Sequence, residues 1–127
     1  MPATSASPAR RLESTAVATL VAWLRQSLGL TYREIGALAG ATTRTAQRWG
    51  DPDDVTVPSP DHRPTLDHLR ELRRLLVATF PDDQTVLTWM HREVPLLDGR
   101  RPIDLVRRGE IEPVLGVLAS VYAGAFV

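Results

Sequence analysis

The spacing of residues 29–49 encodes two short helices joined by a glycine turn. Thr31 and Glu34 stand three residues apart, as in a capping box, in which each side chain bonds a backbone N–H at the start of a helix. Gly40 follows the apolar stripe of that helix and can adopt the left-handed conformation that ends it. A second capped helix then turns Trp49 inward. The segment therefore predicts a helix-turn-helix unit.

The second helix of this unit has a polar outer face that can meet the major groove of DNA. Its sharpest candidate is Arg44, because a guanidinium can bond both acceptors of a guanine together. The alternative interpretation is an ordinary helical corner, since helix pairs are common in all-α proteins. The agreement of caps, glycine turn and closing tryptophan at one spacing favours the DNA-binding interpretation.

The unit resembles the helix-turn-helix of the Xre class of bacterial regulators, in which the second helix reads base edges with its N-terminal part. The resemblance implies phosphate contacts at the start of the first helix and base contacts on the second. The implied DNA-binding residues are Tyr32, Arg33, Thr43, Arg44, Gln47 and Arg48.

The charges are unevenly placed, although the net charge is zero. Residues 1–50 carry six arginines against two glutamates, whereas residues 51–64 carry four aspartates against one arginine. The basic part therefore coincides with the helix-turn-helix unit. So few positive charges support only a few phosphate contacts per chain, and we expect a homodimer or a larger assembly on operator DNA.

Apolar periodicity predicts an all-α fold in two halves. Residues 1–11 are expected to be a flexible N-terminus, and residues 12–50 a helix-turn-helix domain that begins with a long helix. Residues 51–64, rich in proline and aspartate, are expected to be a linker that prevents regular structure. Residues 65–127 form the second helical domain. Fully extended, the linker could reach roughly 45 Å, so the two halves need not be rigidly coupled.

The second half reads as a series of helices. Apolar periodicity predicts one over residues 65–80 and another capped by Asp82 or Asp83. A loop rich in proline and glycine follows, and Pro102 then opens a short helix at a position where proline costs nothing. A last helix runs from about Glu110 almost to the C-terminus.

This half also resembles the toxin-binding domain of Xre/MbcA/ParS-type antitoxins. The family pattern has tryptophan, proline, leucine and glycine in a fixed order, and this chain departs from it at Val94, where an asparagine is often found. With the helix-turn-helix unit included, the resemblance covers residues 12–127. The matching residues are Trp89, Pro95, Leu97, Gly99, Pro102, Leu105, Gly109, Val114 and Leu118.

The resemblance implies an antitoxin of a type II toxin–antitoxin system. Its partner would be a RES-domain toxin that consumes NAD, whose active site the antitoxin blocks, and the antitoxin would repress its own operon. The chain is apolar over residues 121–127, where a free end would normally be polar. This tail is expected to plug the toxin's cleft; the alternative is that it packs on the chain's own helices. The expected toxin-binding residues are Leu97, Gly99, Arg100, Arg101, Tyr122, Gly124, Phe126 and Val127.

Two other classes of protein are alternatives. One is a stand-alone Xre-class transcriptional regulator whose C-terminal half only dimerises. The other is an enzyme, which we do not expect: the histidines His62, His68 and His91 suit no metal site, and cysteine is absent. No cofactor or metal is therefore expected. The sequence shows neither a signal peptide nor a membrane span, so we expect a cytoplasmic protein.

Overall fold

The computed structural model describes residues 7–124, and over that range the chain is all-α, as predicted. It contains no strand there beyond an isolated bridge between Val94 and Arg100. No helix in this range has both the length and the apolar character needed to cross a membrane. The elements are α1 (Pro8–Leu28), α2 (Tyr32–Ala39), α3 (Thr43–Trp49), α4 (Arg63–Thr79), α5 (Asp83–Met90), the 3₁₀ turn η1 (Pro95–Leu97), α6 (Pro102–Arg107) and α7 (Ile111–Gly124).

The first helix begins earlier than the sequence suggested. Ser7 caps α1 by accepting a hydrogen bond from the backbone N–H of Arg10 at 3.2 Å, and Pro8 occupies the first helical position. The expectation of a flexible segment over residues 1–11 is therefore wrong from Pro8 onward. The apolar stripe does not start until Val17, so hydrophobic periodicity carries no sign of the cap. Residues 1–6 lie outside the described residues.

The helix-turn-helix unit forms as predicted. In α2 both bonds of the capping box are present: the backbone N–H of Glu34 donates to Thr31 Oγ1 at 3.0 Å, and that of Thr31 donates to Glu34 Oε1 at 2.9 Å. Gly40 ends α2 with a φ of 73°. Thr42 then caps α3 by accepting from the N–H of Thr45 at 3.1 Å. Local hydrogen bonding alone thus sets the limits of both helices.

A second glycine of this unit allows the tight turn between α2 and α3. A Cβ at Gly36 would lie only 2.7 Å from the carbonyl oxygen of Thr42. The turn comes this close because the backbone N–H of Ala41 donates to the carbonyl of Gly36 at 2.7 Å. Only glycine fits there without moving the turn.

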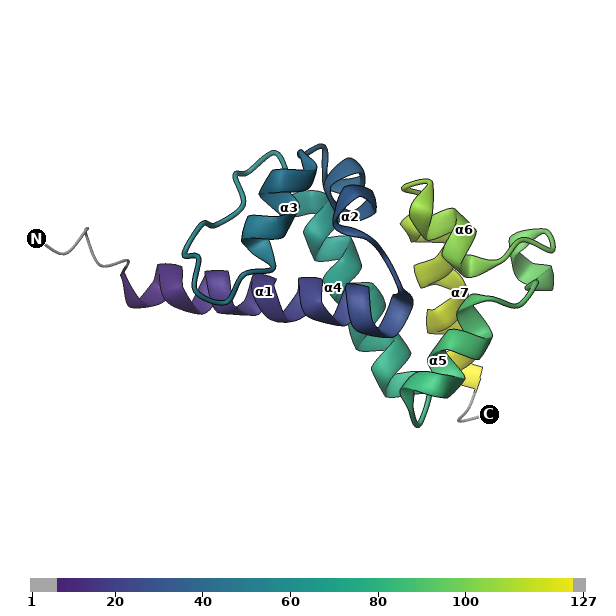
Figure 1. The fold of residues 1–127 in the computed structure, drawn as a ribbon. Helices are drawn as coiled ribbons and strands as arrows, with labels where there is room; N and C mark the ends of the chain where they lie inside the picture. The colour runs from purple at the N-terminus through teal and green to yellow at the C-terminus, as the bar shows by residue number, and fades with distance from the viewer. Residues whose placement is uncertain (1–6, 125–127) are drawn as a thin grey trace, which may run out of the picture.

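The core is continuous from one half of the chain to the other. One apolar face of α4 is buried along its whole length and packs on α2 and α1 as well as on α7 (Figure 1). Helix α1 also contacts α5. The same cluster of buried residues runs from Val17 in α1 to Leu118 in α7. The buried leucines of α4 are Leu66, Leu69, Leu72, Leu75 and Leu76.

The length of the linker leaves open whether the two halves are rigidly coupled, and in the structure they pack against each other. The segment between α3 and α4 is irregular, as its prolines require, but it is fastened to its neighbours. His62 Nδ1 lies 2.8 Å from the carbonyl oxygen of Ala39, at the end of α2. An ion pair of 2.9 Å between Glu34 of α2 and Arg107 of α6 joins the two halves directly. A linker that could extend far does not separate the two halves, because each half has an apolar face that is buried against the other.

The remaining helices follow their predicted signals. Asp82 caps α5, because its carboxylate accepts the backbone N–H of Thr85 at 2.7 Å. Pro102 opens α6, and Gly109 with a φ of 80° separates α6 from α7. The last helix buries one stripe that includes Val114 and Leu118. These elements position the loop between α5 and α6 at one end of the molecule (Figure 1).

Two glycine-to-alanine substitutions test the role of the tight turn. Gly36→Ala should lower the free energy of unfolding by about 1 to 3 kcal/mol, because the new methyl collides with the Thr42 carbonyl. Gly116→Ala is the matched control: Gly116 is helical and a Cβ there meets nothing within 4 Å. It should leave stability unchanged or raise it by roughly 0.5 to 1 kcal/mol. Urea denaturation measures both, and equal effects would contradict this account of the turn.

Candidate functional sites

The outer face of α3 carries the predicted polar side chains. Ala46 and Trp49 are buried and hold α3 on the core. This orientation leaves four side chains exposed on the opposite face, as the spacing predicted. They are Thr43, Arg44, Gln47 and Arg48.

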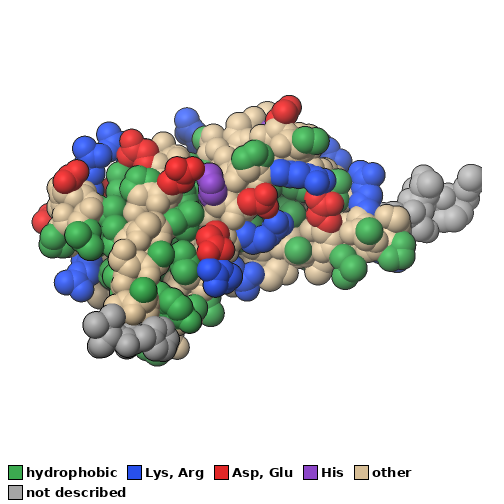
Figure 2. All heavy atoms as spheres, turned by 180° about the vertical axis from the view of Figure 1, so that it is seen from behind, with side chains coloured by type: hydrophobic (Ala, Val, Ile, Leu, Met, Phe, Trp, Pro, Cys, Tyr) green, Lys and Arg blue, Asp and Glu red, His purple; other side chains and the backbone are tan. Residues whose placement is uncertain are grey.

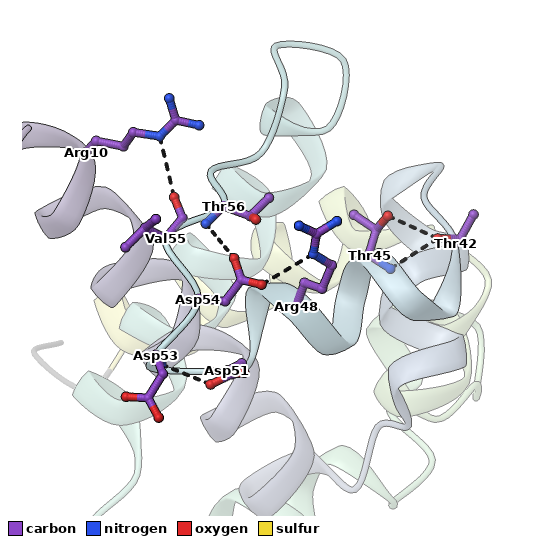
Figure 3. A network of polar contacts seen from close by, with 9 residues as sticks. All are labelled: Arg10, Thr42, Thr45, Arg48, Asp51, Asp53, Asp54, Val55 and Thr56. Carbon is purple, nitrogen blue, oxygen red and sulfur yellow. Dashed lines mark hydrogen bonds and ion pairs between the residues drawn. The ribbon is translucent and has the colours of Figure 1, made fainter. Parts of the chain in front are cut away.

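The two arginines of this face differ in their surroundings. Within residues 7–124 no hydrogen bond or ion pair is made by the side chain of Arg44. Arg48 instead pairs with Asp54 of the following loop, with 3.3 Å between Nε and Oδ2 (Figure 3). Arg44 is therefore available to a ligand, whereas Arg48 has a partner in its own chain.

Asp54 is itself held in place. Its other carboxylate oxygen accepts the backbone N–H of Thr56 at 2.8 Å. The pKa of Asp54 is lowered from its ordinary value, first by hydrogen bonding from the side chain and backbone of Thr56, and to a smaller extent by Arg48. Asp54 is consequently ionised at neutral pH. Sequence periodicity gave no sign of this contact, because Asp54 was assigned to a linker.

Tyr32 and Arg33, the expected phosphate contacts at the start of α2, also differ in their surroundings. Arg33 is exposed. Tyr32 is half-buried: the guanidinium of Arg25 lies 4.0 Å from its ring centroid, and the ring stands beside Gly50. The tyrosine ring therefore packs between α1 and the end of α3 and serves the fold, while Arg33 faces outward.

The loop between α5 and α6 is closed by its own backbone. The N–H of Val94 donates to the carbonyl of Arg100 at 3.1 Å, and the carbonyl of Val94 accepts from Leu97 and Gly99. Asp98 and Gly99 both have positive φ, at 57° and 76°. The valine that departs from the family pattern thus closes this loop through main-chain atoms, which any residue other than proline supplies.

The two leucines of this loop have opposite environments. Leu97 is 6% exposed and belongs to the core, whereas Leu96 is 72% exposed. The expectation that Leu97 contacts a partner is corrected by this burial, and Leu96 is the apolar side chain that the loop presents. Sequence alone could not separate two adjacent leucines, because a 3₁₀ turn has no fixed inward face.

The neighbouring arginines are paired within the chain. Arg101 donates two hydrogen bonds to Asp104, at 2.8 and 3.0 Å, which lower the pKa of the aspartate and raise that of Arg101. Arg100 lies 4.0 Å from Glu110. Both arginines keep about half of their side-chain surface exposed. Their exposed N–H donors can still meet an acidic partner, alongside the carboxylates that they already contact.

The end of α7 is only partly described. Val121 and Tyr122 are exposed, and Gly124 is the last residue of the helix. Phe126 and Val127, which were expected to enter the toxin, lie outside the described residues. Seen from behind, apolar side chains concentrate over the half of the molecule formed by the C-terminal helices, and arginine and carboxylate side chains intermingle across its middle (Figure 2).

A family model matches the second half of the chain. It is the antitoxin Xre/MbcA/ParS C-terminal toxin-binding domain, and the match covers residues 75–120. The closed loop with Leu96 lies inside the matched segment. Tyr122, Gly124, Phe126 and Val127 lie beyond it.

Curated relatives match most of the chain. It is 34% identical over 111 residues to mycobacterial cidal antitoxin MbcA of Mycobacterium bovis and of Mycobacterium tuberculosis, covering 87% of this chain and 96% of the relative. It is 30% identical over 99 residues to the probable mycobacterial cidal antitoxin Rv3188 of M. tuberculosis, covering 78% of this chain and 82% of the relative.

A solved structure agrees with these relatives. The crystal structure of the M. tuberculosis MbcT–MbcA toxin–antitoxin complex matches with a TM-score of 0.52 and 34% sequence identity. The match covers 87% of this chain and 96% of the other. The similarity thus extends over both the helix-turn-helix unit and the C-terminal helices.

Proposed function

This chain belongs to the Xre/MbcA/ParS family of antitoxins, and we propose that it binds and blocks the active site of a RES-domain toxin that consumes NAD. One observation carries the proposal: 34% identity over 87% of the chain to a protein whose crystal structure is a complex with its toxin. We propose in addition that the helix-turn-helix unit represses the antitoxin's own operon. Both activities would take place in the cytoplasm, and neither requires catalysis by this chain.

The loop over residues 94–100 is the first proposed toxin contact. It lies within the matched toxin-binding segment, its backbone is closed by hydrogen bonds, and it holds Leu96 in solvent. A large apolar side chain held out by a rigid loop loses little conformational entropy when a partner buries it. Arg100 and Arg101 flank it and would face an acidic or phosphate-binding part of the toxin.

Two leucines of nearly equal exposure test this contact. Leu96 is 72% exposed and Leu12, near the start of α1, is 73% exposed. Leu96→Ala should weaken inhibition of the toxin roughly tenfold, since burial of such a side chain is worth about 1.5 to 3 kcal/mol. Leu12→Ala should leave inhibition unchanged. The measurement is the rate of NAD consumption by purified toxin against antitoxin concentration.

Thermal melting completes that comparison. Both leucine variants should have the melting temperature of the intact protein, because neither side chain belongs to the core. If Leu96→Ala inhibits the toxin as well as the intact chain does, the loop over residues 94–100 is not part of the interface.

The apolar tail is the second proposed contact. It begins at Val121, in the last turn of α7 and beyond the matched segment, and would fill the toxin's cleft. Deleting residues 124–127 removes Phe126 and should weaken inhibition by roughly tenfold or more while the free antitoxin keeps its melting temperature. A truncated protein that melts several degrees lower yet inhibits fully, at a temperature where both are folded, would show that the tail completes the antitoxin's own core.

The outer face of α3 is the proposed operator contact. Thr43, Arg44 and Gln47 would reach base edges, and Arg33 would contact a phosphate. The small positive charge of the first fifty residues favours two copies on adjacent half-sites. The alternative function, a stand-alone regulator whose C-terminal half only dimerises, shares this contact but lacks the toxin. Light scattering on a mixture with the toxin separates the two functions by the mass of the complex.

Arg44→Ala should cost about 1 to 3 kcal/mol in binding to the operon's promoter and relax one operator position. Fluorescence anisotropy with labelled promoter DNA measures the affinity, and toxin inhibition should be unaffected. Arg92→Ala is the charge-matched control, because Arg92 is exposed at the end of α5, away from α3. Equal affinities of the two variants would contradict the assignment of α3 as the recognition helix.

A further inference from the structure

The loop that follows α3 turns back along the recognition helix and is locked there. The backbone N–H of Asp51 donates to the carbonyl of Arg48 at 3.2 Å, and that of Asp54 donates to the carbonyl of Asp51 at 3.1 Å. The N–H of Asp53 donates to the side chain of Asp51 at 2.9 Å (Figure 3). These bonds give the loop a defined backbone shape beside α3 and fix the carboxylate of Asp51.

The ion pair between Arg48 of α3 and Asp54 of this loop has one well-fixed member and one more exposed member. Asp54 accepts the N–H of Thr56, and the next part of the loop is fastened to α1, because Arg10 Nε donates to the carbonyl of Val55 at 3.4 Å. The side chain of Asp54 is 23% exposed, whereas that of Arg48 is 55% exposed. The exposed side chain of Arg48 is therefore attracted to the Asp54 carboxylate, whose position is set by its bond to Thr56.

This pair lies on the same surface as the proposed base-reading residues. An open depression of about 410 Å³ is lined both by proposed base-reading residues and by the two members of the ion pair. A DNA strand laid against α3 would bring its phosphates near the carboxylates of the depression. Its lining residues are Arg44, Gln47, Arg48, Asp51 and Asp54.

We propose that Asp54 sets the operator affinity of this antitoxin by holding Arg48 away from the DNA backbone. Arg48 stands in the last turn of α3, whereas recognition helices read bases with their N-terminal part, so its natural DNA partner is a phosphate. In the free protein Asp54 occupies the place of that phosphate. The inference rests on the proposed DNA binding and adds a restraint built into the chain itself.

The restraint has two measurable consequences. Removing the charge of Asp54 releases Arg48 to bind one further phosphate per chain, which tightens binding. It also makes the dependence of log K on log salt steeper by roughly 0.9 for each additional phosphate that is neutralised. A general change of net charge would tighten binding without requiring Arg48.

The test is a double-mutant cycle with a charge-matched control. Asp54→Asn keeps an oxygen that can accept the N–H of Thr56 and should tighten promoter binding about fivefold, the upper range for an exposed ion pair. Asp53→Asn removes the same charge from the same loop but not from the ion pair, and should tighten binding less than about twofold. Arg48→Ala alone should weaken binding less than about twofold. In Arg48→Ala combined with Asp54→Asn, the tighter binding should disappear.

Each outcome decides the inference. If Asp54→Asn and Asp53→Asn raise promoter affinity equally, the change in net charge explains the effect and the inference is overturned. Weaker binding by Asp54→Asn would mean that Asp54 presents Arg48 to the DNA, which also overturns it. If Asp54→Asn lowers the melting temperature, Arg48→Ala alone decides: a tenfold loss of promoter affinity in that variant would overturn the inference. Absence of promoter binding by the intact chain would overturn the DNA half of the proposed function and this inference with it, whereas binding without these differences overturns the inference alone.

Discussion

Everything else in this molecule depends on the burial of one leucine face, that of α4. Leu66 and Leu69 are fully buried near its start, and Leu76 is fully buried near its end. Each such side chain contributes roughly 1.5 to 3 kcal/mol when it leaves water. Because the same helix packs on α2 and on α7, this burial stabilises the helix-turn-helix unit and the C-terminal helices together. The surfaces proposed for the toxin and for DNA therefore stand on a single core.

Polar contacts then fix how the parts of that core are oriented. Glu34 illustrates this: one carboxylate oxygen closes the capping box of α2, and the other pairs with Arg107 of α6. Such partly exposed pairs contribute little energy by themselves. Their value is geometric, since a single side chain relates the first turn of the helix-turn-helix unit to the segment that precedes α7.

The features that the sequence predicted are those set by neighbours along the chain. The capping box, the Gly40 turn, the Asp82 cap and the opening of α6 by Pro102 each need only residues within about four positions. One local feature was missed: the cap of α1 by Ser7, followed by Pro8, lies ahead of the apolar stripe from which that helix was predicted.

The other features that were missed depend on contacts between distant residues or on a choice between like residues. The fastening of residues 51–62 depends on Ala39 and Arg10, which lie far away in sequence. The opposite exposure of Leu96 and Leu97 depends on how a turn meets the core. Propensity and periodicity carry no information on either, because both are set by packing in three dimensions.

The shared core also bears on how the chain is made. As the ribosome releases the protein from its N-terminus, α1 to α3 emerge before the α4 leucines that complete their packing, and α4 emerges before α7 covers its other side. Contacts this far apart in sequence carry a loop-closure cost that slows folding. A nascent helix-turn-helix unit therefore completes its packing only after α4 has emerged, and the surfaces proposed for DNA and for the toxin depend on that same helix.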